Sequence, residues 1–210
     1  MKRVLWDVDT QLDFMLPEGR LYVRGAEQTV AAMRRLVEAA RVAGIPHVAS
    51  ADDHELTDEE ISEDPDFEST YPPHCLRGTR GARKIAETDQ EDPVPLGLRL
   101  VGSDWLRGRE FLLLKKSFDV FTNPNTEPLL DLLDPDELIV FGVATDVCND
   151  AAIRGFLARG RKVVFVEDAS RGLDDARVAR CTASWREDGV EFTNAGGAVS
   201  LIQGIAQTSR

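Results

Sequence analysis

The sequence has few cysteines and no long hydrophobic run. Three cysteines stand among 210 residues, at positions 75, 148 and 181, and no two of them form a C-x-x-C pair. An odd number of cysteines at irregular spacing does not indicate a disulfide framework, so a reduced compartment fits better. The apolar stretch near the N-terminus is interrupted at Asp7, and no run approaches the length of a membrane span. The sequence therefore predicts a cytoplasmic protein without a membrane partner.

Positive charge is also scarce. The chain has 25 Lys and Arg residues against 37 Asp and Glu residues, which gives a formal net charge of −12. Because a polyanion would be repelled by this charge and no Lys/Arg stripe is present, we expect no nucleic-acid partner. Neither a G-x-G-x-x-G fingerprint nor a P-loop occurs, so no nucleotide cofactor is predicted.

What the sequence does contain is an alternation of short apolar runs and longer amphipathic stretches. With 42% hydrophobic residues, a chain of this length can bury one substantial core, which predicts a single domain over residues 1–210. Runs such as LIVFGV are apolar throughout, as in parallel strands that are buried on both faces. The pattern predicts a three-layer α/β/α sandwich, Rossmann-like in outline, with a mostly parallel sheet of six strands. The predicted strands are 3–8, 47–51, 111–115, 138–142, 162–167 and 190–193, and the predicted helices are 26–43, 127–133, 146–158, 174–185 and 195–205.

The region from about 53 to 108 interrupts this alternation. It is polar, acidic and rich in proline, with little sustained periodicity. A compact domain rarely carries so long an irregular segment without using it, so we interpret it as a lid or binding loop. The alternative is an acidic surface loop without a functional role.

Three reactive side chains, Asp9, Lys115 and Cys148, stand where predicted strands end. Because ligands of open α/β sheets bind beyond the carboxyl ends of the strands, these three side chains can meet in one pocket. Cys148 also lies in the first turns of a helix, where free N–H groups and the helix dipole favour a thiolate and can hold an oxyanion. A thiol, an acid and an ammonium are the groups that nucleophilic catalysis requires.

Other readings of these positions stay open at this point. Asp7 and Asp13 flank Asp9, and strand alternation places Asp7 and Asp9 on the same side, so periodicity does not choose between them. Lys115 and Lys116 both stand at the end of the apolar run EFLLLKK, so either could supply the ammonium. Cys148 itself has the alternative of being a small buried hydrophobe.

Three motifs, in this order along the chain, resemble those of a known family. Residues Asp9 to Phe14 read D-x-Q-x-D-F, residues Gly142 to Cys148 read G-V-A-T-D-x-C, and Lys115 is followed by aromatic residues at 118 and 121. The chain resembles the isochorismatase-like cysteine hydrolases, and among them it is most similar to the nicotinamidases, also called pyrazinamidases. The resemblance assigns Asp9 as the acid/base residue, Lys115 as its lysine and Cys148 as the nucleophile.

The resemblance further implies a particular backbone arrangement around the nucleophile. It implies a cis peptide bond between Val143 and Ala144. It also implies an oxyanion hole formed by the N–H groups of Ala144 and Cys148.

The same resemblance suggests how a substrate would be held. Phe14 and Tyr71 would sandwich a flat amide, and Phe118 or Trp105 would contribute from a loop or from a neighbouring subunit. Family members tend to form dimers or tetramers, so a homo-oligomer is expected.

A metal site is implied by two further motifs. The family's D-x-H stands here as Asp52 to His54, and its W-P-x-H-C corresponds to Tyr71 to Cys75, which makes Asp52, His54 and His74 the expected ligands. Zinc is the first expectation, with iron or manganese as alternatives, and the metal would bind the substrate rather than generate the nucleophile. The alternative is that both histidines are structural. Tyr71 in place of tryptophan, and Asn149 in place of the usual valine, leave the substrate open.

These observations predict a hydrolase of linear amides. The expected reaction converts a small, nicotinamide-like amide to an acid and ammonia through a thioester on Cys148. A related amidase acting on a carbamoyl or ureido compound is the nearest alternative. A D-x-D phosphatase of the haloacid dehalogenase type, suggested by WDVDTQ, is a remote one, since Gln11 stands where that motif has Thr or Val.

Overall fold

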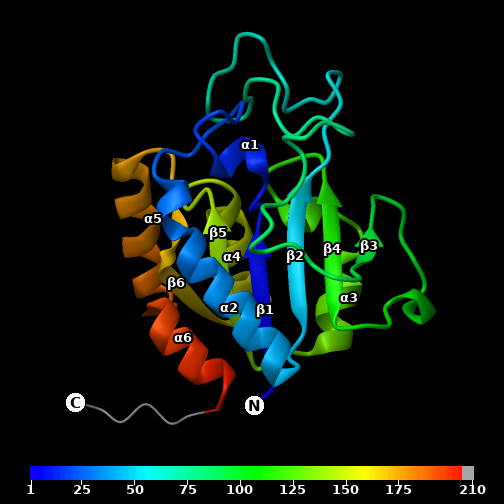
Figure 1. The fold of residues 1–210 in the computed structure, drawn as a ribbon, viewed down its shortest axis with the longest axis vertical. Coiled ribbons are helices and arrows are strands. Elements are labelled where there is room, and N and C mark those ends of the chain that lie inside the picture. The colour runs from blue at the N-terminus through cyan, green and yellow to red at the C-terminus, as the bar shows by residue number, and fades with distance from the viewer. Residues whose placement is uncertain (205–210) are drawn as a thin grey trace.

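The computed structural model describes residues 1–204, which are built around a sheet of seven parallel strands (Figure 1). The strands are ordered β3-β4-β2-β1-β5-β6-β7, and every pairing is parallel. Their bounds are β1 (Arg3–Val8), β2 (His47–Asp52), β3 (Val94–Leu96), β4 (Glu110–Lys115), β5 (Glu137–Val143), β6 (Lys162–Arg171) and β7 (Glu191–Thr193). The four strands β4, β2, β1 and β5 are neighbours in the middle of the sheet. The strand ends that are expected to carry the catalytic residues therefore lie side by side.

Helices cover both faces of the sheet and give the predicted three-layer α/β/α sandwich (Figure 1). One face is covered by α1 (Leu12–Met15), α2 (Val30–Ala43) and α6 (Ala195–Ile202), and the other by α3 (Thr126–Leu133), α4 (Cys148–Ala158) and α5 (Asp175–Glu187). Three short 3-10 helices complete the described elements, namely η1 (Ala26–Thr29), η2 (Ser103–Trp105) and η3 (Val120–Thr122). Among residues 1–204, no helix combines the length and the apolar character needed to cross a bilayer.

The alternation of side chains along the central strands builds two cores. Leu5 and Ile139 pack toward α2 and α6, whereas Trp6 and Val140 pack toward α4. All seven residues of β5 are buried, which explains why its sequence is apolar almost throughout.

Four details of the predicted elements are wrong. The sheet has a seventh strand, β3, which escaped prediction because it has only three residues and contains Pro95, a residue that sheets tolerate at their edges. The helix predicted over 26–43 begins with a 3-10 turn before α2, and the helix predicted from 146 begins at Cys148. The helix predicted over 195–205 ends at Ile202, and Ile205 lies outside the described residues.

Two irregular segments leave the sheet within the region from 53 to 108. The first, residues 53–93, joins β2 to β3 and lies above the carboxyl ends of the strands in Figure 1. The second, residues 97–109, joins β3 to β4 and projects from the edge of the sheet; we call it the arm. The crossover from β2 to β3 contains no helix that could pack an apolar face on the sheet. Buried polar contacts attach it to the central strands instead, such as the ion pair of Lys84 with Asp7 at 2.9 Å.

Candidate active site and metal centre

The carboxyl ends of β1, β4 and β5 bring Asp9, Lys115 and Cys148 together. The Lys115 Nζ atom lies 2.9 Å from Asp9 Oδ2 and 3.9 Å from Cys148 Sγ. Asp9 and Lys115 are at most 1% exposed, and Cys148 is 7% exposed. The backbone at Asp9 has a φ of 50°, an uncommon conformation for a residue other than glycine, and it turns the chain out of the strand. The three predicted side chains therefore converge in one place.

The residues that competed for these roles have other partners. Asp7 forms an ion pair with Lys84 at 2.9 Å, and Lys116 forms one with Asp58 at 2.8 Å. The carboxylate of Asp13 accepts hydrogen bonds from backbone N–H groups of two loop residues. Strand alternation stops where the chain turns at Asp9, so Asp7 and Asp9 lie in different surroundings.

The turn between β5 and α4 shapes the surroundings of the nucleophile. The peptide bond between Val143 and Ala144 is cis. Among residues 1–204, the N–H groups of Ala144 and Cys148 have no hydrogen-bond acceptor. Gly142 is required here because a Cβ atom at this position would lie 2.1 Å from the carbonyl oxygen of Val8. Asn149, which stands where the resemblance expects valine, is buried and donates to the Gly142 carbonyl at 2.9 Å.

The electrostatic surroundings of the nucleophile oppose its ionisation. Burial raises the pKa of the Cys148 thiol well above its usual value, and the nearby Lys115 ammonium only partly opposes this effect. Burial also raises the pKa of Asp9, against the pull of Lys115. Burial alone would lower the pKa of Lys115, but Asp52 and Asp9 hold it well above its usual range. The Lys115 ammonium is already shared by the carboxylates of Asp9 and Asp52, so it offsets only part of the cost of ionising the thiol.

Beside this trio, four side chains form a compact cluster of metal-ligating groups. Asp52, His54, Glu60 and His74 are buried, and one ligand atom from each lies within 4.8 Å of all the others. The Nε2 atoms of His54 and His74 lie 3.7 and 3.4 Å from Asp52 Oδ2, and 3.8 and 4.0 Å from Glu60 Oε1. Lys115 joins the cluster to the trio, since its ammonium contacts both Asp52 and Asp9.

The chemistry of these donors fits a divalent cation. Asp52 Oδ2 and His54 Nε2 are buried without a hydrogen-bond partner among the described residues, which is costly unless a ligand binds them. The other ring nitrogens have outer partners: His54 Nδ1 lies 3.3 Å from Asp58 Oδ2, and His74 Nδ1 lies 2.7 Å from the carbonyl oxygen of Pro72. Such partners orient ligating histidines so that both Nε2 atoms point inward.

Glu60 is the member of this cluster that sequence reasoning missed. It is one of nine acidic residues between 53 and 70, and nothing in its neighbours distinguishes it. Its second oxygen, Oε2, accepts a hydrogen bond of 2.7 Å from the N–H of Phe118. Only the fold shows that this carboxylate, unlike the others in the segment, is turned inward and 6% exposed.

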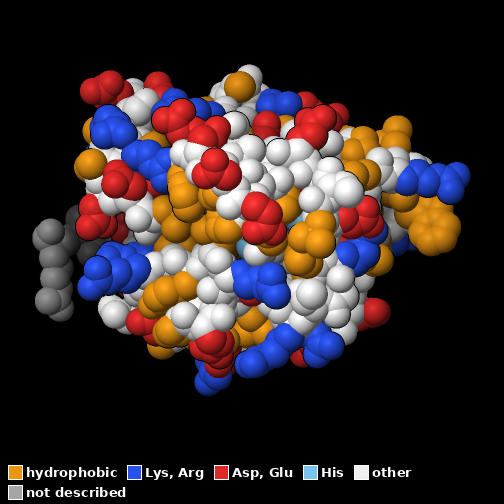
Figure 2. Space-filling model, turned by 90° about the horizontal axis from the view of Figure 1, so that it is seen from above, with side chains coloured by type: hydrophobic (Ala, Val, Ile, Leu, Met, Phe, Trp, Pro, Cys, Tyr) orange, Lys and Arg blue, Asp and Glu red, His pale blue; other side chains and the backbone are white. Residues whose placement is uncertain are grey.

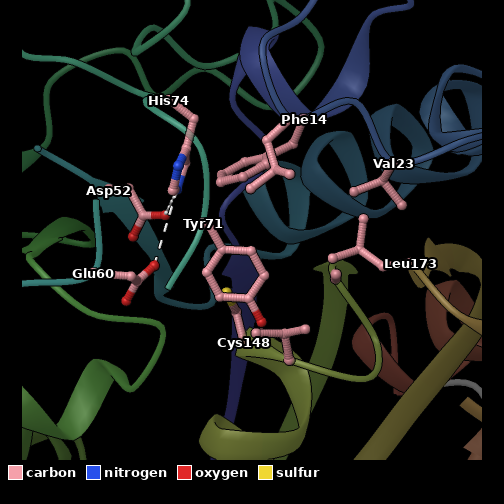
Figure 3. A pocket seen from close by; sticks show the side chains of 11 residues that line it. Phe14, Val23, Asp52, Glu60, Tyr71, His74, Cys148 and Leu173 are labelled. Carbon is pink, nitrogen blue, oxygen red and sulfur yellow. Dashed lines mark ion pairs between the residues drawn. The ribbon is translucent and has the colours of Figure 1, made fainter. Parts of the chain in front are cut away.

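A pocket opens onto Cys148 and onto three members of the metal-ligating cluster, Asp52, Glu60 and His74. In Figure 3, His74, Asp52 and Glu60 lie on one side of the pocket and Val23 and Leu173 on the opposite side. Phe14 and Tyr71 line the pocket between these two sides, as the resemblance implies.

Two aromatic residues expected near the substrate lie elsewhere. Phe118 packs against the core on the α4 side, and it reaches the site only through its backbone N–H. Trp105 lies in the arm and is 71% exposed.

Comparison with known proteins finds similar sequences along most of the chain. A family model described as "Isochorismatase domain" matches residues 4–96 and 99–196. The nicotinamidase/pyrazinamidase of Mycobacterium tuberculosis is 27% identical over 193 residues, which covers 90% of this chain and 97% of that protein.

Solved structures show the same fold at low identity. An isochorismatase family protein from Desulfovibrio vulgaris has a TM-score of 0.76 at 22% identity, covering 96% of this chain and 98% of its own. The pyrazinamidase of Pyrococcus horikoshii in complex with zinc has a TM-score of 0.74 at 20% identity, covering 92% and 99%. The N-carbamoylsarcosine amidase of Thermoplasma acidophilum has a TM-score of 0.72 at 24% identity, covering 93% and 97%.

Proposed function

Since the chain belongs to the isochorismatase family of hydrolases, we propose that it is a cysteine-dependent amidase that converts a small, uncharged, nicotinamide-like amide to an acid and ammonia. The observation that carries the proposal is the position of the Lys115 ammonium, 2.9 Å from Asp9 and 3.9 Å from the sulfur of Cys148. Cys148 lines the same pocket as Asp52, Glu60 and His74 of the metal-ligating cluster. A structural role alone would not explain a buried thiol, acid and amine at the open end of a sheet.

In the proposed reaction, Asp9 is the group that moves protons. It accepts the proton of the Cys148 thiol, and the resulting thiolate attacks the carbonyl carbon of the amide. The N–H groups of Ala144 and Cys148 hold the oxyanion, while Lys115 balances the charge that passes between the acid and the sulfur. Asp9 then protonates the departing ammonia. It next takes a proton from a water molecule, which hydrolyses the thioester and releases the acid and the thiol.

The metal-ligating cluster is proposed to hold a divalent cation that binds and orients the substrate. Asp52, His54, Glu60 and His74 offer two nitrogen and two oxygen ligands, a set that suits zinc and also iron or manganese. Zinc is the first expectation because a zinc complex is known for the similar pyrazinamidase of Pyrococcus horikoshii.

The charge of the pocket favours a neutral aromatic amide over a carbamoylated amino acid. The lining contains two carboxylates, from Asp52 and Glu60, whereas no arginine and no lysine lines it. The side opposite the cluster is aliphatic, with Val23 and Leu173. A carbamoylated amino acid carries a carboxylate, which would be desolvated here without an arginine or lysine partner and beside the carboxylates of Asp52 and Glu60. A flat neutral ring is proposed to lie against Phe14 and Tyr71, which line the pocket.

The proposal is tested by measuring ammonia release from nicotinamide, pyrazinamide and N-carbamoyl amino acids, with metal content determined on the same sample. We expect turnover of the neutral aromatic amides, and a loss of at least about 10⁴-fold in Cys148→Ala. Cys181→Ala, which removes a half-buried thiol from α5, is the matched control and should keep its activity. Full activity in Cys148→Ala would refute the thioester mechanism, and preferential turnover of carbamoyl amino acids would refute the substrate assignment. Activity that resists thiol alkylation would instead favour the phosphatase alternative.

A further inference from the structure

The arm presents large apolar side chains to solvent. Leu98, Leu100 and Trp105 are 49%, 60% and 71% exposed. The other two tryptophans of the chain, Trp6 and Trp185, are fully buried. Clustered exposure of this kind on one projecting segment is typical of interaction surfaces.

The arm is held in this exposed conformation by buried contacts at its base. The Asn125 side chain is fully buried, donates to the carbonyl oxygens of Gly97 and Arg99 at 2.8 and 3.0 Å, and accepts from the N–H of Val101 at 2.9 Å. Leu106 anchors the second half of the arm in the core. The apolar side chains are therefore displayed by a fixed backbone, which lowers the entropy cost of binding a partner.

The charge of the arm is opposite to that of the chain as a whole. Residues 97–109 contain three arginines and one aspartate, which is a local charge of +2 in a chain of net charge −12. Arg99 has no ion-pair partner among the described residues, and Arg107 pairs only with Asp104, at 3.4 Å, within the arm itself. A partner for this surface should be acidic and partly apolar.

The same chain offers a surface of that description in residues 53–70, which we call the acidic loop. It contains nine Asp and Glu residues and no Lys or Arg. Two apolar side chains on it, Leu56 and Phe67, are 65% and 50% exposed. Five of its acidic side chains are exposed and have no ion-pair partner within residues 1–204, namely Glu59, Glu63, Asp64, Asp66 and Glu68. Figure 2, which views the molecule from this end, shows acidic side chains interspersed with hydrophobic ones.

We propose that the arm of one copy of this chain docks on the acidic loop of a second copy. Leu98, Leu100 and Trp105 cover Leu56 and Phe67, and the arginines of the arm lie against the unpaired carboxylates of the loop. A two-fold axis makes the contact twice, so the assembly closes as a dimer. The acidic loop also carries His54 and Glu60 of the metal-ligating cluster, but these two side chains are buried. Because the contact uses exposed side chains and none of the catalytic trio, it stands independently of the proposed amidase function.

The dimer is tested first through mass and tryptophan fluorescence. Sedimentation equilibrium of the full chain should give a dimer that dissociates on dilution. Because Trp105 is the one exposed tryptophan of three, its emission should shift to shorter wavelength, and acrylamide quenching should fall, as the dimer forms. Trp105→Ala should raise the dissociation constant by about tenfold or more. Val42→Ala, which removes an 84% exposed side chain from α2, is the matched control and should leave the dissociation constant unchanged.

Charge reversal then tests which surfaces meet. The double change Glu63→Lys and Glu68→Lys should break the proposed contact, because it places lysines against the arginines of the arm. It also reduces the net negative charge of the chain, which would favour unspecific association, so a loss of the dimer cannot come from general repulsion. The double change Glu38→Lys and Glu187→Lys, at exposed helix positions, alters the net charge equally and should not break it. Adding Arg99→Glu and Arg107→Glu to the reversed loop should restore the dimer.

Two results would overturn the proposal. One is a monomer at every concentration up to the solubility limit. The other is an oligomer whose dissociation constant is insensitive to Trp105→Ala and to the loop reversal, since such an assembly must use a different surface.

Discussion

Asp7 in β1 and Asp9 just after it, only two positions apart, have opposite electrostatic surroundings. Burial would raise the pKa of Asp7, but Lys84 and His47 outweigh it and hold the pKa below its usual value. For Asp9, burial prevails over Lys115 and the pKa is raised. Strand alternation could not distinguish these residues, because the left-handed turn at Asp9 is a property of the folded backbone. The D-x-Q-x-D-F motif pointed to Asp9 without giving this physical reason.

This difference predicts opposite effects of the same substitution at the two positions. Asp9→Asn should lower kcat by about 10²- to 10⁴-fold, since no other group is placed to move the proton. It should not destabilise the fold at neutral pH. A buried carboxyl with a raised pKa lowers the free energy of unfolding when it ionises, and Asn has no such cost. Asp7→Asn should lower the free energy of unfolding by about 3 kcal/mol, since it leaves the Lys84 ammonium buried with a weaker partner.

Ammonia release and urea unfolding of both variants provide the measurement. Comparable destabilisation in the two, or full activity in Asp9→Asn, would contradict this assignment of roles.

At the scale of elements, Gln11 joins the end of β1 to the end of β2. Its Oε1 accepts from the N–H of Asp52 at 2.7 Å, and its Nε2 donates to the Asp52 carbonyl at 2.7 Å and to the Ala82 carbonyl at 2.8 Å. The side-chain amide thus continues the hydrogen bonding of the sheet at the point where the metal-ligating residue leaves it. The motif identified Gln11 as a family marker, but only the structure shows what the amide does.

Gln11→Glu should therefore weaken metal binding from a distance. The substituted side chain has the same shape but lacks the two N–H donors, so two buried carbonyls lose their partner and Asp52 shifts. We expect affinity for zinc, measured by competition with a chelator, to fall by about tenfold to a hundredfold, as for other losses of support behind metal ligands. Gln28→Glu, at an exposed position, is the control and should bind zinc as the unaltered chain does. Unchanged zinc affinity in Gln11→Glu would show that the amide has no such role.

The elements that sequence predicted well are those whose hydrophobic pattern repeats. The central strands and the helices α2 to α4 each bury one periodic face or a continuous apolar run, and this is visible in the sequence. The strand β3 and the inward turn of Glu60 are set instead by contacts between distant segments, such as that of Glu60 with the Phe118 N–H. Local sequence carries no signal for such contacts.

At the scale of the whole molecule, the charge of −12 and the buried ion pairs respond to acid in opposite directions. Protonation reduces the mutual repulsion of the carboxylates, which favours the compact state. Carboxylates whose pKa is lowered by folding resist protonation, so acid destabilises the protein through them. Asp7 is one of these, and it lies outside the metal-ligating cluster.

The contribution of Asp7 can be isolated by comparing pH profiles of stability. Its pKa in the folded protein lies below the value of about 3.9 for an unfolded chain, so its stabilisation is complete above that value and is lost as the pH falls toward the folded pKa. Over that window the unaltered chain should lose up to about 1.4 kcal/mol per pH unit more than Asp7→Asn does. Asp131→Asn removes a side chain that is 80% exposed and controls for the loss of one negative charge. Urea unfolding from pH 6 to pH 3 measures all three proteins, and parallel profiles for Asp7→Asn and the unaltered chain would show that Asp7 and Lys84 do not form a stabilising pair.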